Sequence, residues 1–153
     1  MRQYIARFVA LAAFALPLCG QTQTKFFGSE AELQRWADQT AANFATENYD
    51  EAWKRVRSRS IAPNSETDVV ETRFKENLPR ILQRYGKPDG SIGGYELVQA
   101  DKRGESLLQY IYLVRLERGP LRLVFVFYRE AQGWVLTEFL FDTGSAGFFE
   151  IQD

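Results

Sequence analysis

The sequence lacks histidine altogether and contains a single cysteine among its 153 residues. Without histidine, the chain has no Ser-His or Cys-His nucleophile and no histidine ligand for a metal ion. A single cysteine forms neither an internal disulfide nor a thiolate metal cluster. We therefore expect the protein to use no metal and no cofactor.

The chain also has almost no net charge. It carries 19 Lys and Arg against 20 Asp and Glu, for a formal net charge of −1. No basic excess is present to hold a phosphate backbone, which argues against nucleic acid as the main partner. The remaining composition, 45% hydrophobic and 25% charged, suits one soluble domain rather than two.

The N-terminus has the pattern of an export signal. Arg2 and Arg7 make a basic start, and residues 8–18 form an apolar run of eleven residues. This run is well short of the roughly 18 residues that span a bilayer, and its length fits a signal peptide. A buried core helix, the alternative, agrees less well with the basic start. We expect residues 1–20 to be removed, the protein to be periplasmic or secreted, and the mature chain to have no transmembrane span.

Cys19 leaves two outcomes open at the end of this signal. Residues 16–20 (LPLCG) resemble a bacterial lipoprotein box, in which the cysteine is lipidated after cleavage. The sequence departs from that box at Leu18, where a small residue is usual. Either ordinary cleavage occurs near Cys19 or Gly20, or Cys19 anchors the protein to the envelope for a role in assembly or interaction.

Apolar residues at three- and four-residue steps predict helices in the first half of the chain. After a polar leader at 21–28, which we expect to be mobile, the spacing predicts an amphipathic helix over 30–47 and a short helix after Asp50. A third helix is predicted over 67–85, with Pro79 kinking or splitting it. Arg55, Arg57 and Arg59 should form the solvated side of the second helix.

After residue 90 the apolar period changes to two, which predicts strands. The connecting turns are short, so the strands should form an antiparallel meander. Helices followed by strands indicate an α+β fold, with N-terminal helices packed on a curved antiparallel four-stranded sheet. The domain should cover residues 29–142, followed by a tail at 143–153. The predicted strands are 95–100, 107–116, 121–128 and 134–141.

Two segments carry a resemblance to a known family. Residues 48–53 (NYDEAW) give a short acidic turn and an aromatic-Ala-Trp helix, and residues 130–139 (EAQGWVLTEF) give a Gly-Trp followed by a hydrophobic strand. With three helices before the sheet, the chain resembles the nuclear transport factor 2-like cone over residues 29–142. The resemblance implies the fold more than a function. Many exported members are domains of unknown function, and others are isomerases or dehydratases with a polar cluster in the cone.

Strand arithmetic singles out Glu138. If residues 131–132 close the last hairpin, Phe125 faces Glu138, and a register that pairs Leu116 with Leu121 adds Tyr112 to the same row. Glu138 would then be a lone carboxylate on the helix-facing side. It would act as an acid or base beside the phenol of Tyr112 or Tyr110, as in a keto–enol isomerase. The alternative is a structural Glu that reaches water or bonds Tyr and Arg side chains.

The leading hypothesis is an exported, non-catalytic domain that binds a small apolar molecule in the cone or a protein partner on the sheet. The alternatives are an isomerase or hydrolyase that uses Glu138 with Tyr112, and the lipid-anchored envelope protein. The opposite sheet face is too apolar to face water freely, so a second copy, or the tail with Phe148 and Phe149, should cover it. The predicted ligand contacts are Trp53, Tyr110, Tyr112, Phe125 and Glu138. The apolar residues of the opposite face are Val124, Val126, Tyr128, Val135, Phe139 and Phe141.

Overall fold

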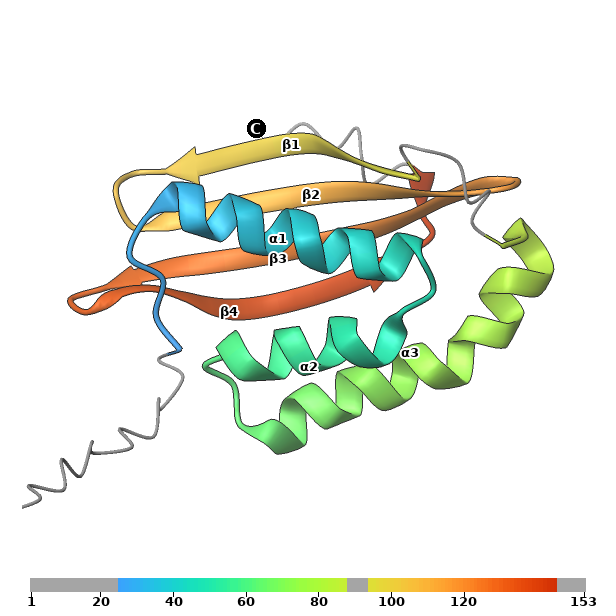
Figure 1. The fold of residues 1–153 in the computed structure, drawn as a ribbon, viewed down its shortest axis with the longest axis horizontal. Coiled ribbons are helices and arrows are strands. Elements are labelled where there is room, and N and C mark those ends of the chain that lie inside the picture. Colours follow the sequence, from blue (N-terminus) through green and yellow to red (C-terminus); the bar gives the residue numbers. More distant parts are fainter. Residues whose placement is uncertain (1–24, 88–93, 146–153) are drawn as a thin grey trace, which may run out of the picture.

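The computed structural model describes residues 25–87 and 94–145. It confirms the predicted α+β class: three helices pack on one face of an open, antiparallel four-stranded sheet with strand order β1-β2-β3-β4 (Figure 1). The helices are α1 (Glu30–Ala45), α2 (Tyr49–Arg59) and α3 (Asn64–Tyr85). The strands are β1 (Tyr95–Arg103), β2 (Leu107–Leu116), β3 (Gly119–Glu130) and β4 (Gly133–Asp142).

The helix ends follow local chemistry, although α1 ends at Ala45 rather than at 47 and α3 begins at Asn64 rather than at 67. Ser29 caps α1 by accepting a hydrogen bond from the Glu32 backbone N–H at 3.2 Å. Pro79 lies inside α3 without splitting it, and the helix changes direction along its second half (Figure 1), as the lost backbone hydrogen bond would allow. Gly86 ends α3 with a φ of 81°, a left-handed conformation that glycine adopts without strain.

The register between β2 and β3 differs from the prediction by two residues. Leu116 pairs with Gly119 and Val114 pairs with Leu121, so the hairpin is tighter than a Leu116–Leu121 pairing requires. Because side chains alternate with a period of two, an even shift leaves the predicted faces unchanged. The shift does change which residues are cross-strand neighbours: Phe125 pairs with Tyr110 rather than with Tyr112.

A β-bulge in β4 overturns the predicted position of Glu138. Phe127 pairs with Leu136 as expected, but Val126 pairs with Glu138, which leaves Thr137 as an extra residue. The Thr137 hydroxyl donates to the Val126 carbonyl at 3.0 Å. An inserted residue reverses the facing of every later residue. The exposed Glu138 therefore lies on the outer face, while Phe139 turns inward and is 7% exposed.

The space between helices and sheet is filled by aromatic side chains. Phe44 stacks on Phe139 with ring centroids 5.6 Å apart, and Phe74 meets Phe141 edge-on at 4.9 Å. The inward turn of Phe139 and Phe141 removes both from the outer face to which the sequence assigned them. The largest fully buried aromatic residues are Phe27, Phe44, Trp53, Phe74, Tyr112, Phe125 and Phe127.

Two extended segments cover the first half of the β4 edge. Phe27 and Trp134 exchange backbone hydrogen bonds of 2.8 and 3.0 Å, and Ile61 N–H donates to the Leu136 carbonyl at 2.8 Å. Phe27 is completely buried, so the expectation of a mobile leader over 21–28 is wrong at this residue. The Phe27 ring is part of the hydrophobic core.

The arginines of α2 do not form the solvated side that the sequence suggested. Each guanidinium bonds to a neighbouring segment, and Arg59 also lies over the Phe27 ring, 4.3 Å from its centroid. The three side chains therefore tie α2 to its surroundings. The partners include Thr40, Trp36 and Gln39 for Arg55, Asp68 and Glu71 for Arg57, and the Phe26 carbonyl and Glu32 for Arg59.

Candidate functional site

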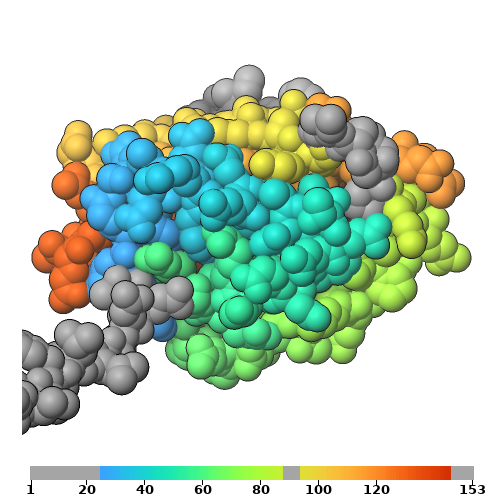
Figure 2. Space-filling view, in the orientation of Figure 1, coloured from blue at the N-terminus to red at the C-terminus, as the bar shows by residue number. Residues whose placement is uncertain are grey.

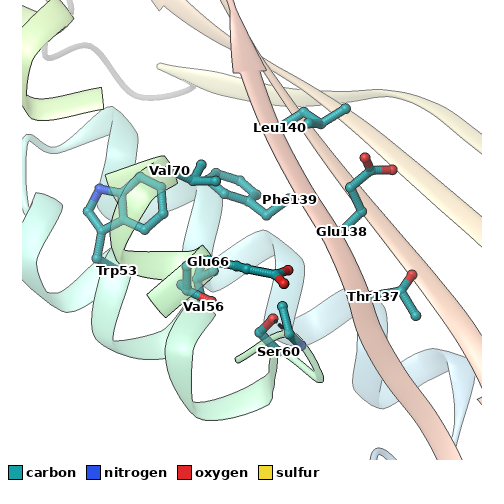
Figure 3. A pocket seen from close by; sticks show the side chains of 11 residues that line it. Trp53, Val56, Ser60, Glu66, Val70, Thr137, Glu138, Phe139 and Leu140 are labelled. Carbon is teal, nitrogen blue, oxygen red and sulfur yellow. Dashed lines mark hydrogen bonds between the residues drawn. The ribbon is translucent and has the colours of Figure 1, made fainter. Parts of the chain in front are cut away.

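A groove of about 400 Å³ lies between β4 and the two helices α2 and α3 (Figure 3). We call it the β4 groove. In Figure 3, Phe139 points from β4 toward the helices, where Val70 and Trp53 face it. Its volume is at the lower end of the range for small-molecule sites, about 300–1,000 Å³. The apolar lining is Trp53, Val56, Ala62, Val70, Phe139 and Leu140, and the polar lining is Ser60, Glu66, Thr67, Thr137 and Glu138.

Trp53 forms part of the groove wall and is anchored in the core. Its ring lies 5.3 Å from that of Phe139 and 5.7 Å from that of Phe74, centroid to centroid. The side chain is fully buried, and its indole N–H has no hydrogen-bond partner in the described part of the chain. An unpaired buried donor costs about 1–3 kcal/mol, so Trp53 holds its position through packing alone.

Two carboxylates sit at the groove without a cation. Glu66 extends from the first turn of α3 toward β4, and Glu138 points to the other side of the strand (Figure 3). Within residues 25–87 and 94–145, neither carboxylate forms an ion pair or accepts a side-chain hydrogen bond. The part of the chain that the structure describes places no lysine or arginine in the groove lining. The groove therefore has an acidic border on both sides of the β4 edge.

The edge of β4 beside the groove has unused backbone groups. Trp134 and Leu136 direct hydrogen-bonding groups away from β3, to Phe27 and Ile61. In an antiparallel ladder, successive residues direct their N–H and C=O groups alternately toward the paired strand and away from it. Because the bulge adds one residue after Leu136, Phe139 and Phe141 are the next residues whose N–H and C=O groups point away from β3. Among the described residues, no backbone or side chain bonds these groups at that edge.

The structure separates the acid and the phenol that the sequence placed together. Tyr112 is fully buried on the helix-facing side, where its hydroxyl donates to the Asp38 carboxylate at 2.7 Å. Glu138 lies on the opposite face and on another strand. Burial, followed by the hydrogen bond to Asp38, raises the pKa of Tyr112 well above its usual range. Tyr112 is thus a neutral donor to α1 rather than a partner of Glu138.

Of the five predicted ligand contacts, the structure brings Trp53 and Glu138 to one groove. Tyr110, Tyr112 and Phe125 belong to the packed core instead. Burial raises the pKa of Tyr110 as well. Sequence reasoning missed Glu66 and Val70 as groove residues, because their position depends on where α3 lies. Cys19, Phe148 and Phe149 lie outside the described residues, so the predicted lipidation and tail contacts remain predictions.

The described ranges lack two features that would bear on function. Residues 25–87 and 94–145 contain no group of three or more Cys, Asp or Glu side chains arranged to hold a metal ion. None of the described helices combines the length and apolar character needed to cross a bilayer. In comparisons with known proteins, no family model, no curated protein and no solved structure matches the chain.

Proposed function

We propose that the protein is an exported, non-catalytic binding domain that holds its ligand in the β4 groove. The observation that carries this proposal is a hollow at the β4 edge whose accessible apolar lining is Ala62, Val70 and Leu140. Unpaired carboxylates and free backbone groups of β4 lie beside this lining. Small-ligand and peptide sites share this composition: an apolar lining with a few polar groups that fix orientation.

The groove replaces the interior of the cone as the expected site. The predicted apolar ligand would have to lie among Tyr110, Tyr112 and Phe125. These three side chains are at most 5% exposed and pack on one another and on the helices. Interiors packed at this density hold no drug-sized molecule without rearrangement.

A binding role also agrees better with the side-chain arrangement than turnover does. The isomerase hypothesis needs an acid and a phenol on one face, whereas Glu138 and Tyr112 are on opposite faces of the sheet. Export rests on the basic start and apolar run of residues 1–20. The nuclear transport factor 2-like resemblance remains our proposal for ancestry, and the order of three helices before an antiparallel meander supports it.

Nile red, a neutral dye that fluoresces in apolar sites, tests whether the groove binds. The test variant is Ala62→Trp, which fills the groove from its rim. The matched control is Ile61→Trp, because Ile61 is 46% exposed and does not line the groove. We expect saturable binding by the wild-type chain, an unchanged affinity for Ile61→Trp and a loss of about tenfold for Ala62→Trp, equal to about 1.4 kcal/mol. Equal affinities in all three proteins would refute the assignment of the site.

A further inference from the structure

The helix layer of this protein is wider than its sheet. α1 packs on β1 and β2, α2 packs on β4, and α3 packs on α2. Neighbouring helices are about 8–10 Å apart, and neighbouring strands are about 4.8 Å apart. α3 therefore extends beyond the last strand by about the width of one or two strands. Figure 1 shows α2 and α3 beside β4, outside the outline of the sheet, and Figure 2 shows the three helices as one continuous surface.

Two hollows lie along the β4 edge, beside residues that are two positions apart in the strand. Phe139 lines the β4 groove, and Phe141 lines a second hollow of about 240 Å³ between α3 and the end of β4. These are the two residues whose backbone groups point outward. An added strand pairing with both would pass the two hollows in turn, because side chains two residues apart share one face.

We propose that the β4 edge, from Thr137 to Phe141, is the docking site for an extended peptide segment of a partner protein, which adds a fifth strand under α3. This inference rests on the proposed binding function and specifies its ligand. The chain already uses the same edge in this way. Phe27 and Ile61 lie along its first half and hydrogen-bond with Trp134 and Leu136.

The charges along the edge select the composition of the peptide, and we take the antiparallel direction because that ladder is the more stable one per residue. Glu66 and Glu138 lie at the groove end, on the helix side and the outer side of the strand. Arg80 and Arg84 line the second hollow, and neither forms an ion pair within the described residues. An antiparallel peptide would therefore have acidic residues at its N-terminal end, an apolar alternating centre, and basic residues at its C-terminal end.

Two other occupants fit this edge less well. Pairing two β4 strands antiparallel places both helix layers on the same face, so α2 and α3 of both copies would compete for one space. Residues 146–153 of the chain itself contain Glu150 and Asp153 and no basic residue. They cannot complement Glu66 and Glu138, and residues 143–145 leave β4 toward β3 (Figure 1).

The test uses the full-length protein and two synthetic peptides of identical composition. The first reads two glutamates, Thr-Val-Thr-Val and two lysines, and the second is its reverse. Both are acetylated and amidated, and binding is measured by titration calorimetry. We expect the first peptide to bind about tenfold more tightly, because exposed ion pairs contribute a few-fold each. On binding, the amides of Phe139 and Phe141 should exchange more slowly with solvent.

Two controls separate backbone pairing from charge. Two modified forms of the first peptide are compared, one N-methylated at both threonines and the other at both valines. Because only alternate N–H groups face β4, one of the two forms should lose binding and the other should keep it. The double variant Glu66→Gln with Glu138→Gln should reduce the preference between the two peptides to the share that Arg80 and Arg84 contribute. Glu76→Gln with Glu105→Gln, which changes two exposed acids outside the groove, should keep the whole preference.

Each remaining outcome decides against a defined part of the account. Nile red binding without peptide binding leaves the proposed function intact and refutes the added strand. Failure of both ligands refutes both proposals. If peptide binds only after residues 146–153 are removed, the chain's own segment is the occupant and the partner peptide is refuted. Equal binding of the N-methylated peptides would show that the edge takes side chains without strand pairing, and that result also refutes the inference.

Discussion

Phe139→Ala tests the bulge that decides the facing of β4. Phe139 is 7% exposed, and its ring centroid lies 5.0 Å from Phe125, 5.3 Å from Trp53 and 5.6 Å from Phe44. Truncating a buried phenylalanine costs about 3–5 kcal/mol, a large share of the roughly 5–15 kcal/mol that holds a domain folded. The neighbouring Leu140 is 46% exposed, so Leu140→Ala should cost about 1 kcal/mol.

Urea unfolding followed by tryptophan fluorescence measures both changes. With an m value of about 2 kcal/mol/M, Phe139→Ala should lower the unfolding midpoint by about 2 M, and Leu140→Ala by about 0.5 M. Glu138→Leu should leave the midpoint within about 0.5 M, because Glu138 is exposed. A regular strand without the bulge predicts the reverse. Near-neutral Phe139→Ala together with a strongly stabilising Glu138→Leu would refute the register described above.

Three further predictions concern other parts of the molecule. Trp53→Ala should lower the free energy of unfolding by about 3–5 kcal/mol, measured by urea unfolding. Trp53→Phe should lower it much less, because phenylalanine keeps an aromatic ring in the core and removes the unpaired buried N–H; equal losses in the two variants would contradict this. Burial raises the pKa of Tyr49 from 10.0 to about 12, so the stability it contributes should be complete below pH 10 and decline between pH 10 and 12; Tyr49→Phe should flatten that decline. Labelled palmitate should appear on the wild-type chain and not on Cys19→Ser if Cys19 is lipidated, and absence of label on both would exclude the lipid anchor.

The secondary-structure elements could be predicted from the sequence because their apolar periods are strong. The sequence predicts a strand at 107–116, the bounds that β2 has, since every even position from 108 to 116 is a large apolar residue. The faces of β2 and β3 also followed from alternation, even where the pairing shifted by two residues. The fold class therefore followed from the spacing of apolar residues alone, which indicates helices in the first half of the chain and strands in the second.

The bulge could not be derived by assuming an uninterrupted period of two, although β4 contains a signal for it. Trp134 and Leu136 occupy even positions, whereas the next large apolar pair, Phe139 and Phe141, occupies odd positions. An extra residue between the two pairs places all four on one face. Glu138 appeared to be a core carboxylate only because that change of phase was not considered.

The candidate site depended on features that no local pattern encodes. The β4 groove exists because α3 extends past the sheet, and Glu66 joins it from a helix turn far away in the sequence. Arg55, Arg57 and Arg59 resembled a solvated run by spacing. Their partners lie on three different segments, and only the packing of those segments around α2 brings them together.

Native mass spectrometry of the protein purified from the cells that make it tests the central claim most directly. Wild type and Ala62→Trp would be compared under identical conditions. The account predicts a mass that lacks the signal peptide and a non-covalently bound ligand on the wild type that is missing from the groove-filled variant. A wild-type protein without ligand, or the same ligand on both proteins, would contradict binding in the β4 groove.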